Sequence, residues 1–273
     1  MSINSFIQKL LFKKSPYREV GIGWIQEKII KHRQTISPKS ITISGKKVNY
    51  LRDEEIVHCL KEIFFEKAYA FETKKLNPYI IDCGSHIGMS ILYYKKVFKN
   101  AIIKGFEPDK VNFEILNKNI AEWGFNDIEV LPNPVWNNDE EIIFETAGAM
   151  GGKINKNQNT DQLSQRLKAI RLADLLVQEI DFLKIDIEGA EFEVLMDCKD
   201  KLHFVKNLFI EFHSNFQEEH KLIEILSVLK KSGFNFYIKE ANNIYPIPFS
   251  KKKSNSPFDI QLNIFATRDL QEN

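Results

Sequence analysis

The sequence is poor in cysteine, and the few cysteines that it has are scattered. Of its 273 residues only 3 are cysteine, namely Cys59, Cys83 and Cys198, and no two of them have CxxC spacing. This pattern excludes a disulfide framework and argues against a structural zinc site. It is typical of a protein that works in a reducing compartment, so we expect a cytoplasmic location.

A net charge of either sign is also lacking. The 38 Lys and Arg residues nearly balance the 37 Asp and Glu residues, which leaves a formal net charge of +1. Nucleic-acid-binding proteins usually carry a basic excess, so no nucleic-acid partner is expected. One basic run, at residues 251–253, lies in a proline-flanked segment and is interpreted as solvated surface.

Long hydrophobic runs are absent as well. No stretch approaches the ~18 apolar residues that suggest a membrane span, so no transmembrane segment is predicted. The apolar residues near the N-terminus are interrupted and precede Lys13 and Lys14, which does not fit a signal peptide. Their helical spacing favours a helix packed on the chain's own core, and a basic amphipathic helix that binds a membrane or a partner is the alternative. These apolar residues are Ile3, Phe6, Ile7, Leu10 and Leu11.

The patterns that are present divide the chain in two. Residues 1–75 are interpreted as an N-terminal extension and residues 76–273 as the main domain. Within the extension, residues 24–30 follow helical spacing, and residues 41–50 alternate around a glycine turn as a short hairpin does. Helical spacing resumes over residues 53–67.

From residue 78 onward, short apolar runs alternate with segments of helical spacing. Strands that alternate with helices form βαβ units, so we predict an α/β, Rossmann-like fold with a mostly parallel sheet. Two final strand-like runs have no helix between them and are expected to form an antiparallel pair at one end of the sheet. The predicted parallel strands are 79–81, 102–106, 128–131, 182–185 and 208–212, the final pair is 234–238 and 260–267, and the predicted helices include 90–98, 109–123 and 217–231.

An irregular insert separates the third and fourth predicted strands. Residues 141–146 are strand-like, residues 147–152 are mostly glycine and alanine, and residues 153–165 are polar and rich in Asn and Gln. We expect the last of these segments to be a mobile loop beside the site.

Ligands of an open α/β sheet bind at the carboxyl ends of its strands. After the first predicted strand, Asp82 precedes Gly84 and Gly88, which have GxxxG spacing rather than the full GxGxxG dinucleotide fingerprint. A carboxylate at this position repels a pyrophosphate and favours a cationic ligand. S-adenosylmethionine, which carries an ammonium and a sulfonium, fits this position better than NAD does.

A second acid, Glu107, ends the second predicted strand. A carboxylate there suits hydrogen bonding to two ribose hydroxyls. Together Asp82 and Glu107 favour an adenosyl cofactor. The alternative is that both acids cap the helices that follow them, a role for which Asp109 is the better candidate.

Further acids follow the fourth and fifth predicted strands. Asp186, Glu188 and Glu191 come after the fourth strand. The fifth carries Glu211 and His213, which strand alternation places on one side. Together these residues could take a hydroxyl proton or hold a metal ion. The alternative for Glu188 and Glu191 is that they satisfy the start of the following helix.

Four motifs contain these residues: Asp82-x-Gly84-x-x-Ile87-Gly88, Gly105-Phe106-Glu107-Pro108, Phe182-Leu183-Lys184-Ile185-Asp186-Ile187-Glu188-Gly189-Ala190-Glu191 and Ile210-Glu211-Phe212-His213. Together they resemble the motifs of the FkbM-type methyltransferases. The resemblance covers roughly residues 60–267 and is most specific in the run 182–191. It implies a seven-stranded, S-adenosylmethionine-dependent enzyme of a family linked to O-methylation of sugars and polyketide hydroxyls.

The resemblance also implies roles for residues in the first two motifs. Asp82, Gly84 and Gly88 would form the cofactor turn, and Glu107, which Pro108 follows, would bind the ribose. The sequence departs from the family at Ser85-His86, where Ala-Asn is more usual. His86 therefore lies on the cofactor loop and either touches the methionine portion or points to solvent.

Asn133 follows the third predicted strand, where this class of enzyme usually contacts adenine. The string Asn133-Pro134 is interpreted as a turn, with an adenine contact through Val135 or Trp136. The Asn-Pro-Pro-aromatic motif of amine methylases, which it partly matches, belongs after the fourth strand, where this chain has Asp186-Ile187-Glu188.

We therefore predict an S-adenosylmethionine-dependent O-methyltransferase that acts on a hydroxyl of a sugar, a glycan or another small-molecule natural product. An alcohol needs help in losing its proton, either from a base, His213 or Asp186, or from Mg²⁺ held by Asp186 and Glu211. The alternatives are a non-catalytic scaffold, which the retained acids argue against, and an RNA or protein methyltransferase. We expect the extension, the insert and residues 242–256 to select the acceptor, and the sequence indicates no oligomeric state.

Overall fold

The computed structural model describes residues 15–33, 35–145, 153–154, 164–247, 249–250 and 252–268. The helix expected near residues 3–11 and the flexible stretch expected at residues 147–152 lie outside the described residues.

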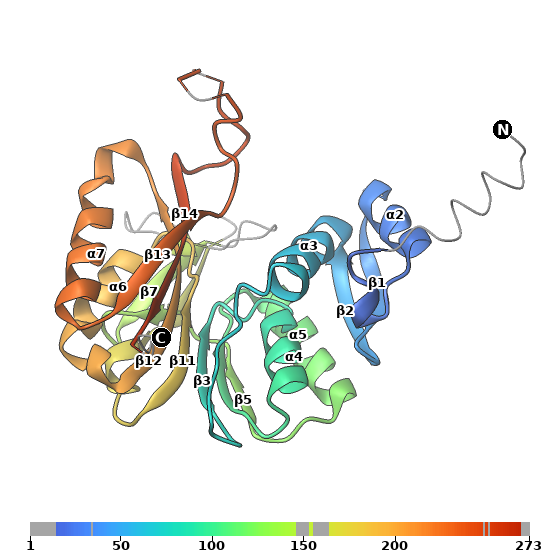
Figure 1. Cartoon of the computed structure of the whole chain (residues 1–273), viewed down its shortest axis with the longest axis horizontal. Coiled ribbons are helices and arrows are strands. Elements are labelled where there is room, and N and C mark those ends of the chain that lie inside the picture. Colours follow the sequence, from blue (N-terminus) through green and yellow to red (C-terminus); the bar gives the residue numbers. More distant parts are fainter. Residues whose placement is uncertain are drawn as a thin grey trace, which may run out of the picture.

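A seven-stranded sheet with the strand order β13-β14-β12-β11-β3-β4-β5 forms the centre of the molecule (Figure 1). Neighbouring strands pair in parallel, except that β14 is antiparallel to both β12 and β13. The predicted Rossmann-like sheet and its antiparallel end are therefore confirmed. The strands are β3 (Tyr79–Cys83), β4 (Ile102–Phe106), β5 (Ile128–Leu131), β11 (Ile180–Ile185), β12 (Val205–Ser214), β13 (Asn235–Glu240) and β14 (Ile260–Thr267).

Helices cover both faces of the sheet. Successive strand residues point to opposite faces, and both faces carry apolar side chains that the helices bury. Ile80 and Ile103 share one core with α4 and α5, whereas Ile81 and Ile185 share the other with α6 and α7. Helix α7 begins later than expected, since η5 (Phe216–Glu218) forms a separate 3-10 turn before it. The four helices are α4 (Met89–Val97), α5 (Lys110–Trp123), α6 (Glu191–Cys198) and α7 (His220–Lys231).

In residues 15–75, apart from residue 34, the structure shows two short helical segments, a hairpin and a longer helical stretch. The hairpin of β1 and β2 is confirmed. The helix expected over residues 53–67 divides, because the Glu66 N–H bonds to Lys61 O, five residues back, at 2.8 Å as in a π-helix. The elements are η1 (Arg18–Val20), α2 (Trp24–His32), β1 (Ile36–Ile43), β2 (Lys46–Arg52), α3 (Asp53–Cys59) and the π-helix η2 (Leu60–Phe65).

The hairpin of the extension packs along α5 (Figure 1). The Trp123 indole N–H donates to Lys47 O at 2.7 Å, and Lys46 Nζ donates to Trp123 O at 2.6 Å. The fully buried Asn119 side chain accepts from the Asn49 N–H at 2.7 Å and donates to Ile87 O at 2.8 Å. One asparagine thus connects the hairpin, α5 and the loop that follows β3.

The described parts of the insert form strands, whereas residues 155–163 of the expected loop lie outside the described residues. Strand β7 (Glu141–Glu145), which the sequence predicts, pairs antiparallel with β8 (Lys153–Ile154) and β9 (Ser164–Lys168). The expectation of a loop over residues 153–165 is therefore wrong at both ends. Pairing with β7 supplies the backbone hydrogen bonds there, so the polar composition does not prevent strand formation. A short parallel pair, β6 (Val135–Trp136) and β10 (Ile170–Arg171), links the insert to the sheet edge.

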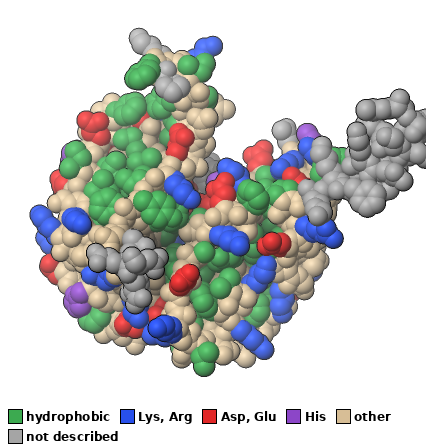
Figure 2. All heavy atoms as spheres, in the orientation of Figure 1, with side chains coloured by type: hydrophobic (Ala, Val, Ile, Leu, Met, Phe, Trp, Pro, Cys, Tyr) green, Lys and Arg blue, Asp and Glu red, His purple; other side chains and the backbone are tan. Residues whose placement is uncertain are grey.

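Charges of both signs are intermixed on the molecular face shown in Figure 2. Among the helices that the structure describes, none combines the length and apolar character needed to cross a bilayer.

Candidate active site

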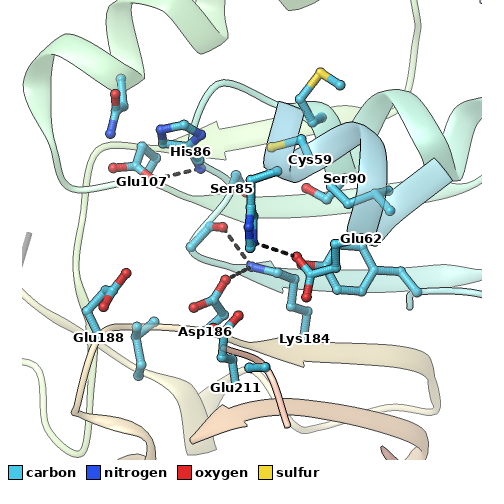
Figure 3. Close-up of a pocket in the computed structure, with 18 of the residues that line it drawn as sticks. Cys59, Glu62, Ser85, His86, Ser90, Glu107, Lys184, Asp186, Glu188 and Glu211 are labelled. Atoms are coloured by element: carbon cyan, nitrogen blue, oxygen red, sulfur yellow. Dashed lines mark hydrogen bonds and ion pairs between the residues drawn. The ribbon is translucent and has the colours of Figure 1, made fainter. Parts of the chain in front are cut away.

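A pocket of about 420 Å³ lies at the carboxyl ends of β3, β4 and β11 (Figure 3). The sheet edge forms one wall, and the extension forms the opposite wall with residues that include His58, Glu62 and Tyr69. Eight of the site residues predicted from the sequence line this pocket: Gly84, Ser85, His86, Glu107, Pro108, Val135, Asp186 and Glu211. The other four, Asp82, Gly88, Asn133 and His213, are not among the lining residues.

The turn after β3 leaves no room for a side chain at Gly84. Gly84 has a φ of +90°, and a Cβ atom added to it would lie 2.0 Å from Asp186 O. Asp82, directly before this turn, is completely buried. Its Oδ2 accepts from Ser90 Oγ at 2.5 Å, and its Oδ1 lies 3.6 Å from Lys184 Nζ. Asp82 therefore stabilises the turn through its contacts with Ser90 and Lys184.

Gly88 and Asn133 also have structural surroundings. A Cβ at Gly88, whose φ is +91°, would lie 2.7 Å from a Leu116 methyl and 3.0 Å from the Trp123 ring. Gly88 thus lets α4 pack closely against α5. The Asn133 side chain donates to Lys168 O at 2.8 Å and ties the end of β5 to the insert, whereas Val135 reaches the pocket.

Glu107 is held in place by two backbone amides. Its Oε2 accepts from the His86 N–H at 2.7 Å, and its Oε1 accepts from the Asp109 N–H at 3.0 Å. Burial raises the pKa of Glu107 to about 7. Asp109 caps α5, as expected, because its Oδ1 accepts from the backbone amides of Val111 and Asn112. Asp109 therefore fills the capping role, and Glu107 contacts the start of α5 through the Asp109 N–H.

His86 is part of the pocket wall and has a left-handed backbone, with a φ of +49°. Burial lowers its pKa to about 4, so the imidazole is neutral near pH 7. Its Nε2 lies 3.9 Å from Glu55 Oε2 of α3. The ring therefore faces the extension rather than open solvent.

Lys184 is a pocket residue to which the sequence reasoning assigned no role. Its Nζ lies 3.0 Å from Asp186 Oδ2 and donates to Gly84 O at 2.8 Å (Figure 3). Burial alone would lower the pKa of Lys184, but the Asp186 and Asp82 carboxylates raise it above its usual value. The available signal was strand alternation, which places Lys184 and Asp186 on the same side.

His213 is enclosed by carboxylates. Its side chain is only 1% exposed, with Nδ1 3.1 Å from Glu191 Oε1 and Nε2 3.4 Å from Glu211 Oε1. Glu188 Oε2 lies 3.6 Å from the same Nε2. Burial alone would lower the pKa of His213, but these carboxylates raise it well above its usual value. Both ring nitrogens are thus engaged, which leaves His213 poorly placed to take a proton from a ligand.

The acids around His213 differ in their proton affinity. Burial raises the pKa of Asp186 to about 6 and that of Glu188 to about 8. Burial acts in the same direction on Glu211, but hydrogen bonding to His213 and its charge lower the pKa of Glu211 to about 2. Glu191 also accepts from the N–H groups of Ile187 and Gly189, which confirms a structural role for it at the start of α6.

Asp186, Glu211 and His213 could hold a metal ion, since their ligand atoms lie within 4.8 Å of one another. Two protein cations already face these carboxylates, namely Lys184 at Asp186 and His213 at Glu211. A divalent ion would have to compete with both, so the donor set fits an internal ion-pair network better than a magnesium site.

The extension contributes a histidine–glutamate pair that the sequence reasoning missed. His58 Nε2 lies 3.3 Å from Glu62 Oε2, and Asn263 Nδ2 of β14 donates to Glu62 Oε1 at 3.1 Å. In Figure 3, Glu62 lies to the right of Asp186 and above Glu211. The signal for this pair was the four-residue spacing of His58 and Glu62 on a predicted helix.

Comparisons with known proteins identify the family of this chain. The model of the methyltransferase FkbM domain matches residues 82–236. "Methyltransferase sdnD" of Sordaria araneosa is 29% identical over 190 residues, covering 55% of this chain and 72% of that protein. "Methyltransferase 1" of Beauveria bassiana is 26% identical over 182 residues, covering 58% of this chain and 72% of that protein.

Among solved structures, the methyltransferase FkbM of Methylobacillus flagellatus aligns with 78% of this chain and 54% of its own, at 13% identity and a TM-score of 0.47. The match of the family model, which spans more than half of the sequence, shows that the chain belongs to the FkbM methyltransferase family, and methyltransferase activity is the activity that this membership supports.

Proposed function

We propose that the chain is an S-adenosylmethionine-dependent O-methyltransferase that acts on a hydroxyl of a sugar, a glycan or another small-molecule natural product. The proposal is carried by one observation within the family domain: the Gly84 turn and the anchored Glu107 carboxyl form one side of a single pocket. A cytoplasmic location and the absence of a nucleic-acid partner stay predictions. The acidic lining of the pocket supports the second of these, because it disfavours a polyanion.

S-adenosylmethionine, when bound, supplies a methyl group that is already activated by the sulfonium. Gly84 lets the turn after β3 lie against the backbone of Asp186 beside the pocket, and Glu107 offers a carboxyl group to the ribose hydroxyls. Val135 and Pro108 provide apolar contacts for the adenine side. Positioning of this kind accounts for a large share of the rate of a group transfer.

Lys184 and His213 keep the acidic end of the pocket in a defined arrangement. Lys184 fixes Asp186, and His213 fixes Glu211. Asp186 and Glu211 line the pocket and are available to orient an acceptor hydroxyl or to face the cationic end of the cofactor. Transfer to oxygen is proposed over amine chemistry because Asp186-Ile187-Glu188 follows β11, where amine methylases carry the Asn-Pro-Pro-aromatic motif.

Titration calorimetry with S-adenosylmethionine tests the cofactor assignment. The wild-type protein should bind with one-to-one stoichiometry, and Gly84→Ala should lose binding because its Cβ would meet Asp186 O. Gly124→Ala is the matched control, since Gly124 also has a positive φ, of +62°, but has nothing within 4 Å of its Cβ position. Absence of binding to the wild-type protein would refute the proposal.

The acceptor class is tested by incubating the protein with labelled S-adenosylmethionine and a panel of sugar, polyketide and amine acceptors. We expect label on hydroxyl acceptors. Transfer only to amines, or to RNA or protein added as further acceptors, would contradict the proposed O-methylation.

A further inference from the structure

The part of the pocket wall that the extension forms carries a histidine, His58. His58 is the single histidine of α3, its side chain is 43% exposed, and it lines the same pocket as Asp186 and Glu211. Glu62, one turn further along, is mostly buried, with 11% of its side chain exposed. The pair therefore places an open imidazole against a shielded carboxylate.

Glu62 is itself fixed by the central sheet. Its Oε1 accepts from Asn263 Nδ2 at 3.1 Å, a contact between residues 201 positions apart in the chain. Its Oε2 lies 3.3 Å from His58 Nε2. If Nε2 carries the hydrogen toward Glu62, then Nδ1 of the neutral ring is left as a proton acceptor. This arrangement matches a base oriented by a carboxylate.

His58 differs from His213 in the respect that matters for proton transfer. His213 is 1% exposed and has carboxylates at both ring nitrogens. His58 has one carboxylate partner and opens onto the pocket. A general base must come within hydrogen-bond reach of the proton that it removes, and of these two histidines His58 is the one that lines the pocket.

We propose that His58 is the base that takes the proton from the acceptor hydroxyl, and that Glu62 is a positioning residue for it. This inference rests on the proposed O-methyltransferase function. The O–H bond of the acceptor breaks and its proton passes to His58 Nδ1. The oxygen electron pair forms the bond to the methyl carbon, while the electron pair of the broken carbon–sulfur bond stays on sulfur.

The surroundings of His58 stabilise the imidazolium that this step forms. Hydrogen bonding to Glu62 raises the pKa of His58, and burial opposes it. The charges of Glu211, from β12, and Asp186, after β11, act in the same direction as Glu62. The other histidine that lines the pocket, His86, is neutral near pH 7 because burial lowers its pKa to about 4. The π-helix η2 begins two residues after His58, and such turns recur at functional sites.

An NMR titration of the histidine rings tests the pair without any acceptor. The His58 resonance, assigned by its loss in His58→Ala, should titrate above the usual value of 6.5. Glu62→Gln should lower this pKa, whereas His220→Ala, which changes an exposed histidine at the start of α7, should leave it unchanged. A His58 that titrates at or below 6.5, or that ignores Glu62→Gln, would overturn the inference.

Transfer kinetics test the catalytic role, with methyl α-D-glucopyranoside and methyl α-D-mannopyranoside as the first acceptors. His58→Ala should lower kcat by roughly 10²–10⁴-fold, the usual contribution of a base, while calorimetric binding of S-adenosylmethionine is retained. Glu62→Gln should shift the acid limb of the kcat profile to lower pH. Wild-type kcat in His58→Ala would overturn the inference and leave the proposed function intact.

Failure of the proposed function has a different signature. It would appear as absent cofactor binding by the wild-type protein, whatever the His58 titration gives. If cofactor binds but neither glycoside is methylated, the kinetic test of His58→Ala is run with the hydroxyl acceptor that the panel identifies.

Discussion

Buried cations organise the pocket at the scale of single residues. Lys184 and His213 have side chains that are 3% and 1% exposed, and each faces at least two carboxylates. Breaking a buried ion pair by removal of one partner leaves an uncompensated charge, which is strongly destabilising. The two cations therefore hold Asp82, Asp186 and Glu211 in place.

The proposed contact between Glu107 and the cofactor should make binding depend on pH. Burial raises its pKa to about 7, so the carboxyl is protonated on the acid side of that value and a carboxylate on the basic side. Only the carboxylate accepts hydrogen bonds at both oxygens without donating one. Calorimetry should therefore show tighter S-adenosylmethionine binding as the pH rises through about 7.

The matched variants isolate this carboxyl. Glu107→Gln should bind more weakly and lose the rise in affinity, because an amide does not ionise in this range. Glu114→Gln, an exposed position on α5, should retain it. An unchanged pH dependence in Glu107→Gln would assign the titration to another group.

Residue types predicted the chemistry at this edge of the sheet, but not which side chains reach the cavity. Strand alternation correctly puts Glu211 and His213 on one side of β12. Glu191 and Gln261, which cover the His213 ring, come from α6 and β14, so its enclosure depends on tertiary packing. Asp82 is similar, because its depth depends on the packing of α4 and Ser90.

At the scale of elements, the hairpin of the extension is connected through α5 to the loop that follows β3. Asn119 bonds to both backbone groups of Asn49 and to Ile87 O within the loop, and it is completely buried. Its side chain thus forms hydrogen bonds with three backbone groups in the buried environment around it. Loss of this amide should loosen the loop and the hairpin together.

Asn119→Ala should lower the free energy of unfolding by at least about 1–3 kcal/mol, the cost of leaving a buried polar group unpaired. Chemical denaturation gives this value, and calorimetry should show weaker cofactor binding because the loop loses a support. Asn117→Ala is the control on the same helix, since Asn117 is exposed and bonds only within α5 to Phe113 O. Equal losses in the two variants would show that the connection to the hairpin has no special weight.

The pattern of apolar residues predicted the order of the strands and helices. Strands buried on both faces and helices buried on one face each require their own spacing of apolar residues. Short elements were harder to predict. The two residues of β8 have too little sequence to show a period, and β9 owes its pairing to β7 rather than to its composition. The π-turn after α3 changes the register of few residues, so the helical pattern of residues 53–67 hides it.

For the molecule as a whole, one hydrophobic core joins the extension to the sheet. Ile43 and Val48 of the hairpin belong to the same buried cluster as Ile80 of β3 and Leu116 of α5. The division at residue 75, predicted from a change in pattern along the chain, therefore crosses a shared core. Since the extension also supplies His58 to the pocket, folding of the two parts and completion of the site are linked.

This shared core predicts a single unfolding transition, although chains of this length often unfold in steps. Scanning calorimetry should give equal calorimetric and van't Hoff enthalpies. Ile43→Ala, at a side chain that is 0% exposed, should lower the midpoint of the whole transition, because a buried Ile-to-Ala change costs about 2–5 kcal/mol. Ile36→Ala on the same strand, where the side chain is 70% exposed, should have little effect. A different result would be an early, separate transition in Ile43→Ala, with S-adenosylmethionine still raising the midpoint of the later one. In that case the extension folds independently of the sheet.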